Sequence, residues 1–297
     1  MAQIGVSCVR GLVRHDECRR CATDPLHPCT LTGDILEGMR EDPNGRHADP
    51  DAFSPTGLLD CDRKHGLSLG RDWYIDIDQG WKMLRGTLVH SLISDYEYPG
   101  AVGVIRETEM EVTIDTAYGP QRMTGQPDIV VVKHLTQTEG GLVARVGIVD
   151  YKSTGKIGHD LIEARRDHVR QVNMYAWLVR RWLPLHYRAS LEVVVDEISI
   201  QYLDFDKTRR FTSAGALETK GKRLNRSAPY QYETLTLAPL TLHPDQVVDR
   251  NIRLMIESKL ESRTELPPAY QQGDTDYWRC AYCPVRAACQ ELTEQGL

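Results

Sequence analysis

An acid and a lysine stand two residues apart at the end of an apolar run, in the segment VGIVDYKST at residues 146–154. Successive side chains of a β-strand point to opposite faces of the sheet, so Asp150 and Lys152 are predicted to share one face. Charged side chains are rarely buried unless they are paired. The pattern acid-x-Lys occurs elsewhere in the chain as well, so the surrounding elements must decide whether this copy does chemistry.

A second acid, Asp128, lies near the start of another β-branched run, GQPDIVVVKHL at residues 125–135. Turn residues at 138–141 separate this run from the one that ends on Asp150, which is typical of a β-hairpin. Antiparallel pairing of the two runs would bring both carboxylates to the same edge, with Lys152 on the same face. The sequence therefore predicts two acids and an ammonium at one spot.

Two carboxylates held that close repel each other unless a cation lies between them. Hard divalent ions prefer carboxylate and carbonyl oxygens as ligands. A lysine beside such an ion can hold the attacking water or stabilise charge on a phosphate. These residue types are those of metal-assisted phosphodiester hydrolysis. The alternative interpretation is a surface ion pair at a strand end.

Elements that would position these residues can be read from the apolar periodicity. A hairpin arm is followed by an amphipathic helix over 159–183, which carries Gln171 and Tyr175. Ser54 and Pro55 mark the start of a helix that would carry Cys61. The remaining predictions are a helix over 81–94, a strand over 104–115, a strand over 191–205 and a helix near 244–262.

Together these residues resemble the PD-(D/E)xK nuclease superfamily, through GQPD at 125–128 and DYK at 150–152. The pattern Gly-x-x-x-His at Gly86–His90 and the pattern Gln-x-x-x-Tyr at Gln171–Tyr175 are similar to its RecB-like branch. The resemblance spans about residues 54–290. It implies an α/β fold with a restriction-endonuclease-like core, in which helices flank a central mixed sheet.

The resemblance also implies roles for the individual residues. His90, Asp128, Asp150 and the main-chain carbonyl of Tyr151 would bind Mg²⁺ or Mn²⁺. Lys152 would be the catalytic lysine. Gln171 and Tyr175 would support the site or contact DNA. A histidine ligand is compatible with Mn²⁺, because imidazole suits it better than it suits Mg²⁺.

Cysteines near the C-terminal end have the spacing of metal ligands: Cys280, Cys283 and Cys289 form C-x2-C-x5-C. Three thiolates need a fourth, and Cys61 is available. A zinc site and an iron–sulfur cluster both fit this spacing. The arrangement resembles the iron–sulfur nucleases of the RecB-like branch, which include CRISPR-associated exonucleases and the AddB nuclease domain. That resemblance favours a [4Fe–4S] cluster as a structural staple.

A separate cysteine group lies at the other end of the chain, at Cys8, Cys18, Cys21 and Cys29. We interpret it as a small zinc site, with His15 and His27 as competing ligands. Unliganded thiols are the alternative. A linker over 40–53 follows, so we expect a Cys-rich module over 1–50 and a nuclease domain over 51–297.

Overall charge is mildly acidic: the 297 residues carry a formal net charge of −6. This net charge argues against indiscriminate binding to nucleic acid, but it is compatible with a local basic groove. Basic residues beside the predicted site could follow DNA phosphates, and we expect little sequence specificity. The expected DNA contacts are Arg165, Arg166, Arg170, Arg209 and Arg210.

No apolar run approaches the ~20 residues that a membrane span needs. The N-terminal segment lacks the apolar core of a signal peptide, so we expect a cytoplasmic, intracellular protein, with a phage gene in a bacterial host as one compatible origin.

The leading hypothesis is a metal-dependent DNA exonuclease acting on single strands or ends. By resemblance its polarity would be 5′→3′. The alternative is a non-catalytic DNA-end-binding adaptor, and the partners compatible with either are a helicase, a recombinase or a CRISPR integrase.

Overall fold

The computed structural model describes residues 3–8, 11–14, 16–18, 51–70, 73–76, 98–154, 164–187, 190–210, 230–237, 240–274, 276, 280, 283 and 285–295. Two compact units divide the chain. The first combines Met1–Leu88, Thr113–Thr124 and Asp249–Leu297, and the second combines Val89–Val112 and Gly125–Val248. Each is described by itself.

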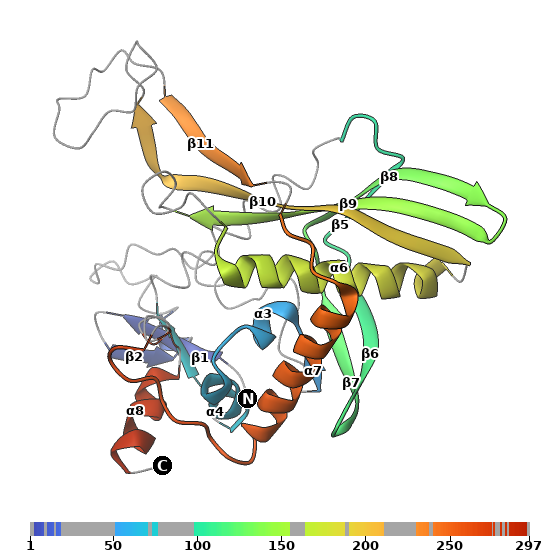
Figure 1. Ribbon diagram of the computed structural model, residues 1–297. Helices are drawn as coiled ribbons and strands as arrows, with labels where there is room; N and C mark the ends of the chain where they lie inside the picture. Colours follow the sequence, from blue (N-terminus) through green and yellow to red (C-terminus); the bar gives the residue numbers. More distant parts are fainter. Residues whose placement is uncertain are drawn as a thin grey trace. The chain divides into compact units, whose positions relative to one another are not determined.

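A five-stranded mixed sheet forms the second unit, in the order β11-β10-β9-β8-β5 (Figure 1). Its strands are β5 (Gly103–Arg106), β8 (Ile129–Thr138), β9 (Gly141–Thr154), β10 (Leu191–Arg210) and β11 (Tyr230–Leu237). The predicted hairpin is present as the antiparallel pair β8–β9, and β10 runs parallel to β9. A parallel pair needs a crossover connection, and a helix provides it.

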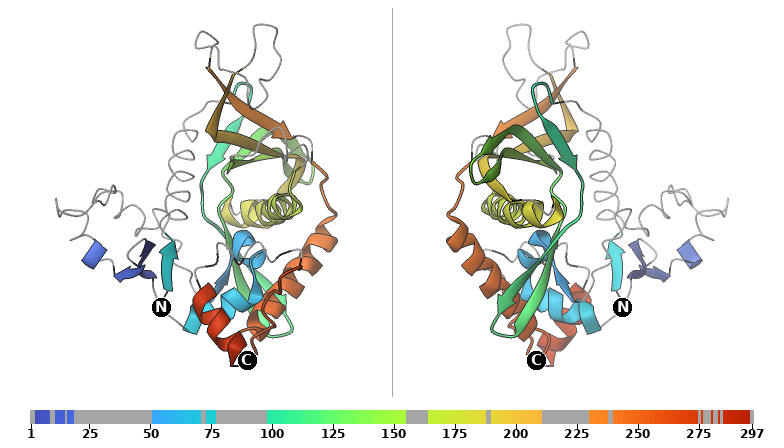
Figure 2. Two further views of the ribbon diagram at one scale, coloured as in Figure 1. Left: turned by 90° about the vertical axis from the view of Figure 1, so that its left-hand side faces the viewer. Right: turned by 90° about the vertical axis from the view of Figure 1, so that its right-hand side faces the viewer.

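That crossover helix is α6 (Arg166–Tyr187), which packs against one face of the sheet (Figure 2). Every residue from Gln171 to Val179 is buried, so the middle of the helix forms much of the core of this unit. The predicted helix over 159–183 is thus present, but it ends four residues later than expected, at Tyr187. Residues 155–163, where we placed its start, lie outside the described part of the chain.

The single strand predicted over 104–115 is wrong, because the chain breaks it at Glu107. Glu107 has a φ of 38°, in the left-handed region that interrupts a strand. The segment therefore splits into β5, in the five-stranded sheet, and β6 (Met110–Thr116), in a different sheet.

Two three-stranded sheets include strands of the first unit. One has the order β3-β7-β6, with β3 (Ala52–Phe53) and β7 (Gly119–Gly125). The other has the order β2-β1-β4, with β1 (Gln3–Cys8), β2 (Gly11–Arg14) and β4 (Trp73–Asp76). The predicted Cys-rich N-terminal module thus contributes two strands to a sheet with a strand after residue 50.

Helices α3 (Pro55–Leu58), α4 (Asp62–Gly70) and α8 (Arg286–Glu294) belong to the first unit, as does most of α7 (Asp245–Glu261). Ser54 caps α3 as predicted, accepting a hydrogen bond from the Gly57 N–H over 3.1 Å. However, α3 ends at Leu58, so Cys61 lies between two short helices and not inside one. Helix α4 contacts α8.

Gly66 is required where α4 approaches the chain just after α7. A Cβ at this position would lie 2.2 Å from the carbonyl oxygen of Ser262. Any side chain here would force the two segments apart, because real Cβ atoms do not approach a backbone oxygen that closely.

Candidate active site

Strand register places Asp128 beside Asp150. Ile129 pairs with Val149 in the β8–β9 ladder, so the next position along brings the two acids opposite each other. Both are buried, with 8% of Asp128 and 1% of Asp150 exposed. The main-chain N–H of Tyr151 donates to Oδ2 of Asp128 over 2.6 Å. This hydrogen bond ties the first acid to the strand that carries the second.

Lys152 lies on the same face as Asp150, and its Nζ is 2.8 Å from Oδ2 of that acid. Burial alone would lower the pKa of this amine, but the charges of Asp150 and Asp128 more than offset that effect and raise it. The ammonium is therefore held charged by the acids beside it. About 21% of its side chain is exposed, which leaves it accessible.

Helix α6 adds two more of the predicted residues. Gln171 and Tyr175 are one turn apart, and the amide Nε2 of Gln171 donates to the hydroxyl of Tyr175 over 3.1 Å. Burial and the nearby charge of Asp150 raise the pKa of Tyr175, so its hydroxyl stays protonated. Tyr175 thus feels the charges of both acids and of Lys152, and Gln171 is bonded to it.

A further polar pair, His168 and Tyr202, lies close to Lys152. The Nδ1 of His168 is 2.8 Å from the hydroxyl of Tyr202, which also accepts a hydrogen bond from the main-chain N–H of Arg165. Burial, then the charges of Lys152 and Arg165, lower the pKa of His168 to about 3. Its imidazole is therefore neutral.

Two sequence signals indicate which face each of these residues lies on, although neither predicts that the two meet. His168 precedes Gln171 by three residues and so shares its helix face. Tyr202 continues the buried alternation of Ile198 and Ile200 along β10, and it pairs in register with Lys152.

The basic residues at the start of α6 are exposed, as a DNA contact requires. Arg165, Arg166 and Arg170 all have exposed side chains. The Nη1 of Arg170 lies 4.0 Å from Oδ1 of Asp167, so the two side chains form only a weak surface ion pair. Arg209 and Arg210 belong to β10, but their side chains lie outside what the structure describes.

The donor set at Asp128 and Asp150 fits a hard divalent ion, because it supplies two buried carboxylates, and the main-chain carbonyl of Tyr151 follows Asp150 directly in sequence. His90, the histidine expected to join them, lies outside the described residues, as does the predicted helix over 81–94. Among the residues that are described, no group of three or more His, Cys, Asp or Glu side chains could hold a metal ion.

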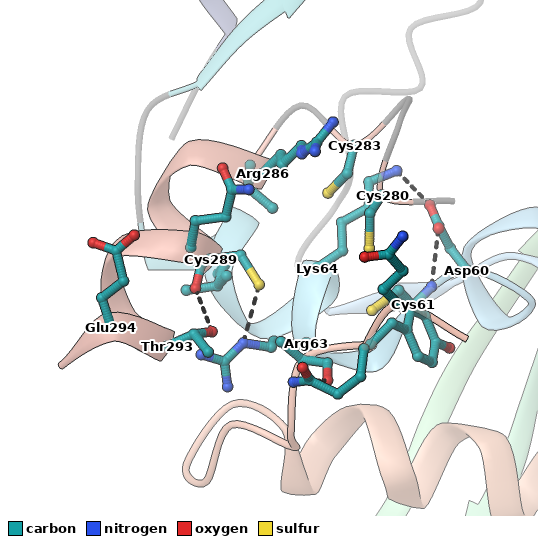
Figure 3. Close-up of a pocket in the computed structure, with 17 residues that line it drawn as sticks. Asp60, Cys61, Arg63, Lys64, Cys280, Cys283, Arg286, Cys289, Thr293 and Glu294 are labelled. Atoms are coloured by element: carbon teal, nitrogen blue, oxygen red, sulfur yellow. Dashed lines mark hydrogen bonds and ion pairs between the residues drawn. The ribbon is translucent and has the colours of Figure 1, made fainter. Parts of the chain in front are cut away.

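A cavity of about 470 Å³ in the first unit brings the predicted cluster cysteines together (Figure 3). Cys61, Cys280, Cys283 and Cys289 all line it, and each is a free thiol. Burial raises the pKa of Cys280, and it raises that of Cys283 to about 11. The thiols share a cavity, but in the described part of the chain they do not form a metal-binding group.

Side chains of helix α7 fix the segment that carries Cys61. Lys259 is 1% exposed and lies 2.7 Å from Oδ1 of Asp62, and Ser258 donates to the other carboxylate oxygen over 2.6 Å. Lys259 also donates to the carbonyl of Asp60. Both neighbours of Cys61 are therefore held by helix α7.

Of the N-terminal cysteines, Cys8 ends β1 and Cys18 is buried. Cys21 and Cys29 lie outside the described residues, as do His15 and His27.

None of the described helices has the length and apolar character needed to cross a membrane.

Comparisons with known proteins were made on sequence and on structure. The family model of the PD-(D/E)XK nuclease superfamily matches residues 97–290. No curated protein matches the sequence. The crystal structure of SSO0001 is similar to this chain with 14% sequence identity and a TM-score of 0.46, over 86% of this chain and 94% of that one.

Proposed function

Because the chain belongs to the PD-(D/E)XK nuclease superfamily, we propose that it is a metal-dependent deoxyribonuclease that hydrolyses phosphodiester bonds in single-stranded DNA or at DNA ends. The observation that carries this proposal is the meeting of Asp128, Asp150 and Lys152 on one face of the β8–β9 hairpin. Nuclease activity agrees with the family, and the exonuclease mode and a 5′→3′ polarity are parts of the proposal.

The residues that would hold Mg²⁺ or Mn²⁺ are Asp128, Asp150, the Tyr151 carbonyl and His90. Such an ion, when bound, lowers the pKa of a coordinated water and stabilises charge on the phosphate. The chain's own residues would position the reacting phosphate and the attacking water. Lys152, anchored by Asp150, would donate to an oxygen of the reacting phosphate or to the attacking water.

Neutral and cationic side chains on and beside α6 would orient the bound DNA strand. Gln171 and Tyr175 are buried donors beside the acids, and they would direct a substrate oxygen toward Lys152. Arg165, Arg166 and Arg170 are exposed in the preceding turn and would contact the phosphate backbone. Arg209 and Arg210 are proposed to extend that contact.

A digestion assay tests the proposal. We expect the purified protein to degrade end-labelled single-stranded DNA with Mn²⁺ or Mg²⁺ and not with EDTA, and to leave closed circles intact. Cutting of closed circles would identify an endonuclease. Absence of cleavage with every divalent metal, combined with tight binding to ends, would support the adaptor alternative.

We also propose that Cys61, Cys280, Cys283 and Cys289 bind a [4Fe–4S] cluster. Their shared cavity supports this, since thiolates are the usual ligands of such clusters. Ligation requires the thiols to lose their protons, which couples cluster binding to pH. Protein purified without oxygen should be brown and contain iron. Zinc in place of iron would identify the four cysteines as a structural zinc site.

The N-terminal cysteines are proposed to bind zinc through Cys8, Cys18, Cys21 and Cys29, within a module over 1–50 that precedes the nuclease domain over 51–297. Replacing Cys18 and Cys21 with serine should remove zinc and leave iron unchanged. Loss of both metals would show that the two ligand groups are assigned incorrectly.

The proposed partners are a helicase, a recombinase or a CRISPR integrase, and co-purification tests them.

A further inference from the structure

Glu107 has an unusual backbone conformation beside the candidate active site. Its φ of 38° makes it the one non-glycine residue with positive φ in the described part of the chain. Such a conformation is unfavourable for a residue with a Cβ, and it persists where surrounding contacts fix it. The contacts that fix Glu107 therefore indicate what the strained conformation achieves.

Two hydrogen bonds connect Glu107 to the segment that carries Asp128. The main-chain N–H of Glu107 donates to the carbonyl of Asp128 over 3.1 Å. The side-chain amide of Gln126 donates to the carbonyl of Glu107. Both main-chain groups of Glu107 are thus bonded to the short segment Gln126–Asp128.

Together with its neighbours in sequence and space, these bonds hold Asp128 from two sides. Pro127 stands between Gln126 and Asp128, so its fixed φ limits the freedom of the segment on one side. On the other side, the Tyr151 N–H holds Oδ2 of Asp128 over 2.6 Å. The carboxylate is oriented from β9, while its main chain is held at the end of β5.

We infer that Gln126 is a positioning residue that fixes Asp128 for divalent-metal binding, through the carbonyl of Glu107. The inference rests on the proposed function, because it assumes that Asp128 is a metal ligand. Outer groups that orient a metal ligand commonly change metal affinity by about 10–100-fold when removed. The main effect of losing Gln126 should therefore be on metal affinity and not on DNA docking.

The test measures Mn²⁺ affinity of the full-length protein by electron paramagnetic resonance of free Mn²⁺, alongside the Mn²⁺ dependence of cleavage. Gln126→Ala should weaken Mn²⁺ binding about 10-fold, and saturating Mn²⁺ should restore most of the turnover. Binding of single-stranded DNA without divalent metal should match wild type. Gln137→Ala is the matched control, because the Gln137 amide donates only locally, to Thr138 on the exposed hairpin.

Gln126→Glu separates hydrogen bonding from shape. The carboxylate keeps the size of the side chain but cannot donate to the Glu107 carbonyl, so this variant should bind Mn²⁺ no better than Gln126→Ala. Thermal melting is recorded for each variant, and we expect shifts of about 3 °C or less from the loss of one hydrogen bond.

Three outcomes overturn the inference. Mn²⁺ affinity of Gln126→Ala equal to that of Gln137→Ala would remove the positioning role and leave the proposed nuclease intact. Recovery of affinity in Gln126→Glu would show that the hydrogen bond donated by Gln126 is not what sets the metal affinity. Wild-type protein that neither binds Mn²⁺ nor cleaves DNA would overturn the proposed function and this inference together, before any variant is compared.

Discussion

The guanidinium of Arg63 donates a hydrogen bond from Nε to the sulfur of Cys289 over 3.2 Å, and from Nη1 to the carbonyl of Pro267 over 2.7 Å. Arg63 is only 2% exposed. The contact fixes the position of Cys289 in the cavity that it shares with the other three cysteines. The contact therefore connects α4 both to the proposed cluster site and to the segment that precedes it.

Replacing Arg63 with methionine should destabilise the protein and reduce its iron content. The side chain keeps its length, but the Pro267 carbonyl loses its donor, which costs about 1–3 kcal/mol for a buried polar group. Urea unfolding and iron analysis after anaerobic purification measure the two effects. Arg286→Met is the matched control, since Arg286 lines the same cavity and is exposed. Equal stability in both variants would show that the buried contacts of Arg63 contribute little.

Replacing Asp150 or Lys152 with alanine should reduce cleavage by at least about 100-fold while DNA binding stays near that of wild type. Both residues act at the reacting phosphate and not on the distant backbone. Gel-shift and cleavage assays on the same preparations separate the two properties. Lys133→Ala serves as the control, because Lys133 forms a half-exposed pair with Glu197 on the same sheet. Near-normal cleavage by either site variant would mean that the catalytic assignment is wrong.

Replacing Arg165 and Arg166 together should weaken DNA binding and make it less dependent on salt. Each lost phosphate contact should reduce the slope of log K against log salt by about one unit. Binding measured at several salt concentrations gives the slope. Arg145→Ala should leave it unchanged, since Arg145 is occupied by a two-bond pair with Asp196. If the double variant has the wild-type slope, the two arginines form a solvated face.

Protonation of His168 should make the protein sensitive to acid. Its pKa is about 3 in the folded protein, against an ordinary value of 6.5. Below pH 6.5 the unfolded chain binds a proton that the folded protein does not, so stability falls as pH decreases from 6.5 toward 3. Between pH 7 and 4 this amounts to roughly 3 kcal/mol at most.

The measurement is urea unfolding at pH 7, 5.5 and 4 for wild type and His168→Gln. The variant should lose less stability over this range than wild type does, because glutamine does not titrate. His134→Gln, which changes an exposed histidine on β8, should behave like wild type. Parallel pH profiles for wild type and His168→Gln would show that His168 titrates normally in the folded protein.

Much of the second unit was predictable because its signals are local. Alternation and turn residues gave the β8–β9 hairpin, and the period of α6 gave the crossover helix. The meeting of Asp128 with Asp150 then follows from register. By contrast, the break at Glu107 has no sequence signature, because glutamate rarely adopts a positive φ and only the contacts with Gln126 and Asp128 explain it.

Long-range contacts are what the sequence could not reveal. The pairing of His168 with Tyr202 joins residues 34 positions apart, and that of Arg63 with Cys289 joins residues 226 positions apart. Neither follows from periodicity. The position of Cys61 between two short helices was missed for a similar reason: α3 stops after one turn, and the chain at Asp60–Asp62 is fixed by Lys259 of α7 instead.

The first unit draws its residues from both ends of the chain, and this determines the order in which it can form during synthesis. Residues 89–248 are all synthesised after Cys61 and before Lys259 and Cys289. At about 5–20 residues per second that interval is roughly ten to thirty seconds. Throughout it the thiol of Cys61 lacks the partners that later surround it. Exposure of the nascent chain to oxidants should therefore reduce the yield of folded protein more than the same treatment applied after synthesis.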